Sequence, residues 1–211
     1  MFILDFDDTL FDSQAFRQSR FDAIKYIGVS KKEFQETYIE ARNDSDGFFV
    51  YSNERHADSL SKIGYDKEEV LNILQGKSTS TMQDFLFPDT LLFLEKIKSF
   101  NEPMILLSLG NSDFQKLKIK DLGIDKYFKH LYFDKKSKKN ILKKIFIEYD
   151  VTSTWFINDK IEETLDLNKQ FCGMCSVLKI CKKFDIKEYT QSNLPHFSSL
   201  TQIAQYVEKN R

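Results

Sequence analysis

The chain contains few residues that interrupt secondary structure. Seven of its 211 residues are glycine and three are proline, a scarcity that argues against low-complexity linkers. The sequence shows no internal repeat. No apolar run approaches the ~20 residues that a membrane-spanning helix requires. No basic segment precedes an apolar one at the start of the chain, so we expect neither membrane association nor a signal peptide.

Cysteine is also scarce. The three cysteines are Cys172, Cys175 and Cys181, and an odd number without a secretion signal favours reduced thiols and a cytoplasmic location. Cys172 and Cys175 have the C-x-x-C spacing of a zinc ligand pair, but a zinc site would require a second pair. We therefore interpret them as small buried thiols of a strand.

The chain has almost no excess of either charge. Lysine and arginine total 31, aspartate and glutamate total 32, and the net charge is −1. Without a basic domain we expect no nucleic-acid partner. The six lysines between Lys135 and Lys144 are typical of a solvated face. The length suits one large domain or a core with an insertion, and the sequence does not determine the oligomeric state.

The most informative stretch is at the start of the chain. Phe2, Ile3 and Leu4 form an apolar run that predicts a buried strand of a parallel sheet. Asp5, Asp7 and Asp8 follow it, and alternation along an extended segment places the first two on one face. Carboxylates crowded at a buried strand end require a cation or a proton, and Mg²⁺ prefers such oxygen ligands. The alternative is a solvated acidic turn.

Strands and helices alternate through most of the chain. Apolar runs predict further strands at residues 104–107, 128–133, 155–157 and 176–180, with helical patterns between them. This alternation predicts an α/β fold with a doubly wound parallel sheet. Residues 13–85 instead show only helical patterns, including a capping box from Ser30 to Glu33. We predict a core of residues 1–12 and 86–211 with a helical cap of residues 13–85 inserted into it.

Polar residues follow three of the predicted strands. Asp5 and Asp7 follow the first, Ser108 the second and Asp159 the fourth. The carboxyl ends of parallel strands meet over one crevice, so we expect these side chains to converge. A phosphoryl-transfer site has three such parts. A carboxylate attacks phosphorus, a metal ion offsets the repulsion between this carboxylate and the phosphate, and a hydroxyl group holds the phosphate oxygens.

These motifs resemble those of the haloacid dehalogenase superfamily. The first motif is Asp5-x-Asp7-Asp8-Thr9-Leu10, the second is Leu107 to Asn111 with Gln115 and Lys118, and the fourth is Phe156 to Asp159 with Glu163. The family often has glycine at the position of Asp8. The resemblance covers nearly the whole chain and implies a Rossmannoid core with a cap that selects the substrate, so we expect the segment Asn43–Tyr51 to lie near the substrate.

The resemblance also implies a role for each motif residue. Asp5 would be the nucleophile that forms an aspartyl-phosphate, and Asp7 would be the general acid and base. Mg²⁺ would bind the Asp5 carboxylate, the backbone carbonyl of Asp7 and Asp159. Ser108 would bind the phosphoryl group. The family's dehalogenases lack an acid at the position of Asp7, because a halide leaves without a proton whereas an alkoxide needs one.

The family also requires a lysine between its third strand and the following helix. Lys135, Lys136, Lys138 and Lys139 are the candidates. We expect Lys136, because Ser137 would then be the helix N-cap and Lys136 would lie outside the helix; Lys138 and Lys139 remain alternatives.

The predicted function is a Mg²⁺-dependent phosphomonoester hydrolase acting on a small phosphorylated metabolite. The fourth motif commonly has glycine or aspartate where this chain has Asn158. That difference leaves open an alternative, a weakly active or inactive phosphate-binding regulatory protein. We expect Asp159 rather than Asn158 to bind the metal, because alternation along a strand turns only one of them toward the crevice.

Overall fold

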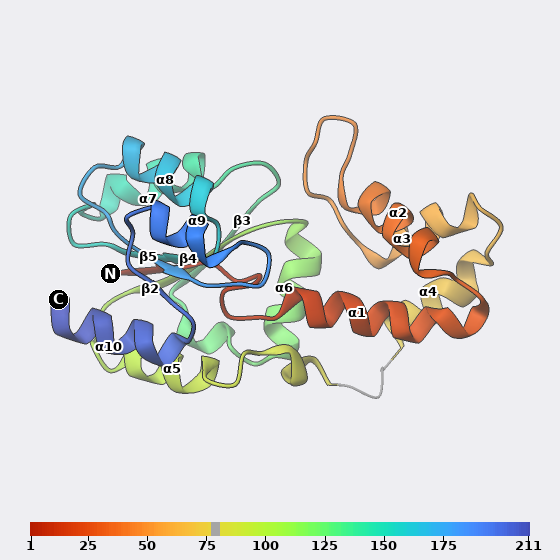
Figure 1. The fold of residues 1–211 in the computed structure, drawn as a ribbon, viewed down its shortest axis with the longest axis horizontal. Coiled ribbons are helices and arrows are strands. Elements are labelled where there is room, and N and C mark those ends of the chain that lie inside the picture. Colours follow the sequence, from red (N-terminus) through yellow and green to blue (C-terminus); the bar gives the residue numbers. More distant parts are fainter. Residues whose placement is uncertain (77–80) are drawn as a thin grey trace.

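A parallel sheet forms the centre of the larger part of the molecule (Figure 1). The computed structural model describes residues 1–76 and 81–211. In these residues the sheet has the order β3-β2-β1-β4-β5-β6, and every neighbouring pair is parallel. The strands are β1 (Phe2–Leu4), β2 (Met104–Leu109), β3 (His130–Asp134), β4 (Trp155–Asn158), β5 (Cys175–Lys179) and β6 (His196–Phe197). The predicted α/β class is confirmed.

The first strand lies in the middle of the sheet. Ile3 pairs with Ile105 of β2 on one side and with Phe156 of β4 on the other. The strand order therefore reverses direction beside β1, and a crevice opens at such a point outside the carboxyl ends of the strands. Because all three residues of β1 are buried, the strand reads as a continuous apolar run.

Helices cover both faces of the sheet. Phe2 and Leu4 belong to the core cluster that includes residues of α5 (Thr90–Lys98) and α10 (Leu200–Asn210). Ile3 belongs to the opposite cluster, with residues of α7 (Lys139–Glu148) and α8 (Ile161–Gln170). This division follows from the alternation of side chains along β1. The remaining elements of the core are α6 (Ser112–Asp121), α9 (Ile186–Gln191) and the 3₁₀ helix Asp125–Tyr127, and the 3₁₀ helix Met82–Phe85, at the end of the predicted cap, packs against the core.

Four helices form a separate group beside the sheet (Figure 1). They are α1 (Ser13–Ile24), α2 (Lys31–Arg42), α3 (Asn53–Ser61) and α4 (Lys67–Gln75), with the 3₁₀ helix Lys25–Ile27 after α1. Their apolar residues make a cluster of their own, and the predicted capping box at Ser30 and Glu33 is present. We take residues 13–85 as the cap, of which residues 77–80 lie outside the described residues. Phe16 and Phe85, near its two ends, pack against the core of the sheet domain.

The C-terminal region differs from the sequence prediction in three respects. Neither β6 nor α9 is predicted, because a two-residue strand and a six-residue helix are too short to show periodicity. Cys172 and Cys175 are exposed, so the interpretation of these two residues as buried thiols is wrong; Cys181 is buried.

None of the helices that the structure describes has both the length and the apolar character that crossing a membrane requires.

Candidate active site

Asp5 lies directly after β1, at the point where the strand order reverses. Its side chain is buried, and its backbone N–H donates to the carbonyl of Ile157 at 2.9 Å, which extends the pairing with β4. Its Oδ1 lies 2.8 Å from Nζ of Lys138. A buried carboxylate requires such a partner to remain ionised. A carboxylate at a strand end, facing a pocket, is a candidate nucleophile.

Lys138, and not Lys136, is the lysine beside Asp5. Nζ of Lys138 is also 2.8 Å from Glu163 Oε2, and the side chain is fully buried. Burial alone would lower the pKa of Lys138, but the charges of Asp5 and Glu163 more than offset this and raise it above its usual value. The ammonium is therefore permanently charged at neutral pH.

The expectation that Lys136 contacts the nucleophile is wrong, because α7 begins later than predicted. Oδ1 of Asp134 accepts hydrogen bonds from the backbone N–H groups of Lys136 and Ser137, at 2.8 and 3.0 Å, and so forms a turn after β3. Lys138 becomes the N-cap of α7 and points inward. The ammonium of Lys136 lies 5.3 Å from the ring centroid of Phe48 in the cap.

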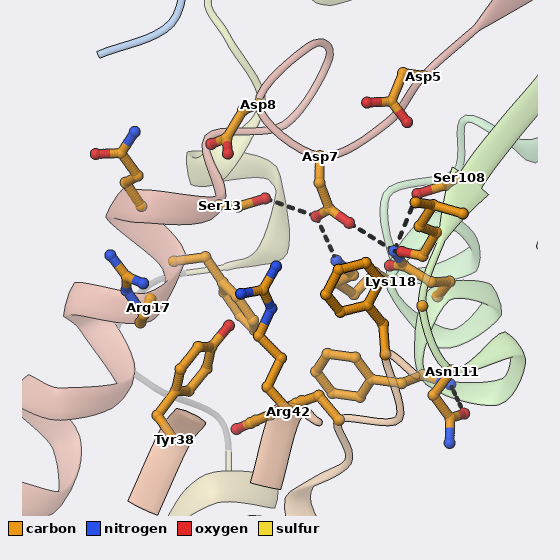
Figure 2. A pocket seen from close by; sticks show the side chains of 18 of the residues that line it. Asp5, Asp7, Asp8, Ser13, Arg17, Tyr38, Arg42, Ser108, Asn111 and Lys118 are labelled. Carbon is orange, nitrogen blue, oxygen red and sulfur yellow. Dashed lines mark hydrogen bonds and ion pairs between the residues drawn. The ribbon is translucent and has the colours of Figure 1, made fainter. Parts of the chain in front are cut away.

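Asp7 is held by three donors (Figure 2). Ser13 Oγ and Gln115 Nε2 each donate to its carboxylate at 2.6 Å, and Lys118 Nζ lies 2.8 Å from Oδ1. Burial would raise the pKa of Asp7, but the charge and hydrogen bond of Lys118 and the bonds from Ser13 and Gln115 outweigh it and lower the pKa from 3.8 to about 2. Asp7 is therefore ionised at neutral pH in this arrangement.

Ser108 and Gln115 connect Asp7 to the end of β2. The buried Ser108 Oγ accepts a hydrogen bond from Gln115 Nε2 at 3.1 Å. Gln115 packs over Gly110, whose φ is +147° and where a Cβ atom would meet Gln115 Nε2 at 3.0 Å. The sequence motif included Gln115 and Lys118 without a role for either. In the structure both side chains bind the carboxylate of Asp7, Gln115 through a hydrogen bond and Lys118 through an ion pair.

Asp159 follows β4 and has the properties of a metal ligand. It is buried, and within the described residues its Oδ1 has no hydrogen-bond partner. Burial, and then the charge of Asp5, raises the pKa of Asp159 from 3.8 to about 7. Two buried carboxylates that repel each other, one with an unpartnered oxygen, fit a divalent cation.

The described residues contain no group of three or more histidine, cysteine or acidic side chains gathered as a metal cluster. The predicted ligand set is smaller than that, because it uses two carboxylates, of Asp5 and Asp159, and only the backbone carbonyl of Asp7. The side chain of Asp7 is engaged by Lys118, which agrees with a role for the carbonyl alone.

Asn158 is buried beside the site instead of facing away from it. Its Oδ1 accepts from Lys138 Nζ at 3.1 Å, and its Nδ2 donates to Glu163 Oε2 and Thr164 Oγ1 at 3.0 Å each. The amide thus supports the Lys138–Glu163 pair. Asp159 has a different side-chain partner, the thiol of Cys181, and the expectation that Asp159 rather than Asn158 binds the metal stays a prediction.

A cavity of about 180 Å³ lies between the sheet domain and the cap. Figure 2 shows Arg17, Tyr38 and Arg42 of the cap on the side of the pocket opposite Asp5, Asp7 and Asp8. The residues of the lining that carry charge are Asp5, Asp7, Asp8, Arg17, Arg20, Arg42, Lys118, Lys160 and Lys183. Phe49 and Tyr51 also line it, so the segment Asn43–Tyr51 contributes to the wall.

Comparison with known proteins agrees with this arrangement. A family model described as haloacid dehalogenase-like hydrolase matches residues 1–171. The chain belongs to the haloacid dehalogenase-like hydrolase family. Among curated proteins, no sequence matches it.

Solved structures show the same fold for this hydrolase. A haloacid dehalogenase-like hydrolase of Burkholderia xenovorans is 17% identical with a TM-score of 0.72, covering 97% of this chain and 94% of its own. The HAD-hydrolase YfnB of Bacillus subtilis, described as bound to magnesium, is 15% identical with a TM-score of 0.64. The match covers 97% of this chain and 96% of YfnB. A protein described as a β-phosphoglucomutase of Thermotoga maritima is 12% identical with a TM-score of 0.69. The match covers 99% of this chain and 98% of that protein.

The structure of the hydrolase also reveals an ion pair that the sequence does not suggest. Asp8 has a φ of +59°, the left-handed region that glycine adopts most easily and aspartate tolerates. Its buried carboxylate forms an ion pair with Lys183. The two residues are 175 positions apart, and no local pattern marks Lys183.

Proposed function

We propose that the hydrolase is a Mg²⁺-dependent phosphomonoesterase that acts through an aspartyl-phosphate. The observation that supports this reaction is the position of Asp7, a second carboxylate in the same pocket as the candidate nucleophile Asp5. An alkoxide leaving group requires a proton donor there, whereas a halide does not. The family name alone would equally suit a dehalogenase.

The proposed reaction has two steps. A carboxylate oxygen of Asp5 attacks the phosphorus atom, the bond between phosphorus and the ester oxygen breaks, and the departing alkoxide takes a proton from Asp7. Water then attacks the phosphorus of the aspartyl-phosphate, gives a proton to Asp7 and releases Asp5 and inorganic phosphate. The ionised Asp7 of the structure suits the second step. The proton for the first can enter with the substrate, since the second pKa of a phosphate monoester is about 6.

Other groups around Asp5 stabilise charge in both steps. The Lys138 ammonium, 2.8 Å from Asp5, would offset charge on the phosphoryl oxygens, and the Ser108 hydroxyl would donate to one of them. Mg²⁺, held by the carboxylates of Asp5 and Asp159 and the carbonyl of Asp7, would reduce the repulsion between nucleophile and phosphate.

The test is a comparison of substrates and metals on the purified protein. We expect hydrolysis of 4-nitrophenyl phosphate that requires Mg²⁺ and stops with excess chelator, and no release of halide from a 2-haloacid. Full activity in chelator would contradict the metal role. Halide release would identify a dehalogenase, and phosphate binding without turnover would favour a regulatory protein.

A further inference from the structure

The cap side of the active-site pocket carries cations that are not matched by acids. Three acidic side chains line the pocket, and each has a lysine partner: Asp5 pairs with Lys138, Asp7 with Lys118 and Asp8 with Lys183. The same lining includes Arg17 and Arg42 of the cap and Lys160 at the start of α8. Among the ion pairs of the described residues, none involves these three side chains.

The contacts of these cations are aromatic. The guanidinium of Arg17 lies 5.5 Å from the ring centroid of Tyr38, and that of Arg42 lies 4.6 Å from the centroid of Phe49. Nζ of Lys160 lies 5.7 Å from the same Phe49 ring. Aromatic faces orient a cation but do not neutralise its charge, so its N–H groups remain available to an anion.

Tyr38 lines the active-site pocket together with the cap arginines and Asp7. Burial raises the pKa of the Tyr38 hydroxyl, the charges of Arg42 and Arg17 oppose this shift, and the charge of Asp7 adds to it. Arg17, Tyr38 and Arg42 line the same pocket as Asp7, on the side opposite its carboxylate (Figure 2). A group attached to the leaving oxygen would extend from Asp7 toward these arginines.

We infer that the substrate is a small phosphomonoester whose leaving group carries a second anionic group, a carboxylate or another phosphate, which Arg17 and Arg42 bind. The inference rests on the proposed phosphatase function. A guanidinium is suited to this role because its planar fork donates two hydrogen bonds to a carboxylate or phosphate. The second group would lie in the cavity of about 180 Å³ that Arg17 and Arg42 line.

The test compares esters that differ only in the second group. The probes are the phosphate ester of glycolic acid, the matching ester of glycolamide and the bisphosphate of ethane-1,2-diol, with 4-nitrophenyl phosphate as a reference. For the wild-type hydrolase we expect kcat/KM for one or both of the probes with a second anionic group to exceed that for the amide by roughly 10- to 100-fold, the range of hydrogen bonds to a charged group. The preferred probe identifies the second group as carboxylate or phosphate.

Arg17→Gln and Arg42→Gln should each reduce this ratio by about tenfold or more. Lys32→Gln is the matched control, because Lys32 lies on the cap helix α2 with 82% of its side chain exposed, and it should leave the ratio unchanged. Equal kcat/KM for all three probes, or an unchanged ratio in both arginine variants, would overturn the inference while 4-nitrophenyl phosphate is still hydrolysed. Failure to hydrolyse any phosphate ester would instead overturn the proposed function.

Discussion

The two lysines on either side of Ser137 have different surroundings because of one turn. Asp134 accepts hydrogen bonds from two successive backbone N–H groups, and this turn delays the start of α7 until Lys139. Lys138 is then buried against Asp5, and Lys136 reaches the cap. Four lysines within five positions offer no sequence signal for this choice, because each has the same chemistry and only the turn distinguishes them.

Replacement of Lys138 by methionine should reduce kcat for an aryl phosphate by about 100- to 1,000-fold, the range for loss of a group that stabilises transition-state charge. Lys136→Met is the matched control and should change kcat by less than about threefold, since its ammonium lies over Phe48. Circular dichroism should establish that both variants are folded. Loss of activity in Lys136→Met with Lys138→Met unaffected would restore the sequence-based assignment.

Gly110 should be required for activity because Gln115 packs against it. A Cβ atom at Gly110 would lie 3.0 Å from Gln115 Nε2, the nitrogen that donates to Asp7. We expect Gly110→Ala to displace Gln115 and reduce kcat about tenfold or more, the effect of losing a hydrogen bond to a charged group.

Gly123→Ala separates this effect from backbone strain. Gly123 also has a positive φ, of +63°, but a Cβ atom there would meet no atom within 4 Å. Both substitutions should lower the free energy of unfolding by about 1 kcal/mol, and only Gly110→Ala should lower kcat. Equal kcat in the two variants would show that Gln115 does not need to be held in place.

At the scale of elements, the loop from Asn43 to Tyr51 joins the cap to the sheet domain. The backbone N–H of Phe49 donates to the carbonyl of Lys135 at 2.7 Å, and Arg42 and Lys160 both lie against the Phe49 ring. The sequence predicts the helices on either side of this loop from their apolar spacing and caps. It does not predict the contact, because pairing between residues so distant in sequence follows from tertiary packing.

The cap helices also contain a buried neutral histidine. His56 is fully buried, with Tyr51 Oη 3.1 Å from Nδ1 and Thr37 Oγ1 3.3 Å from Nε2. Burial, and then the charge of Arg20, lowers its pKa from 6.5 to about 3. The folded chain therefore lacks a proton that the unfolded chain binds below about pH 6.5, so stability falls as the pH falls through this range.

His56→Gln should remove this part of the pH dependence. Between about pH 7 and pH 5 the free energy of unfolding of the wild type should fall by about 2 kcal/mol more than that of the variant, because glutamine does not titrate. Urea denaturation at the two pH values measures the free energy of unfolding of the wild type and of the variant. Parallel losses in the two proteins would contradict a neutral buried His56.

At the scale of the whole molecule, the sheet order explains how residues far apart in sequence form one site. Asp5 and Asp159 follow β1 and β4, and Ser108 lies near the end of β2; these three strands are adjacent in the sheet. Their convergence could be predicted because parallel strands end at the same edge. Lys138 and Lys183 come from turns and loops with no regular geometry, so the sequence offered Lys138 only as one of four candidates and gave no sign of Lys183.

The central claim is that Asp5 carries the phosphoryl group during turnover. The most direct measurement is rapid acid quenching of the hydrolase with excess phosphate ester and Mg²⁺, followed by mass spectrometry of the N-terminal peptide. We expect the mass of one added phosphoryl group on Asp5, removed by hydroxylamine and absent from Asp5→Asn. Turnover at a normal rate in Asp5→Asn, or phosphorylation of another residue, would contradict the claim.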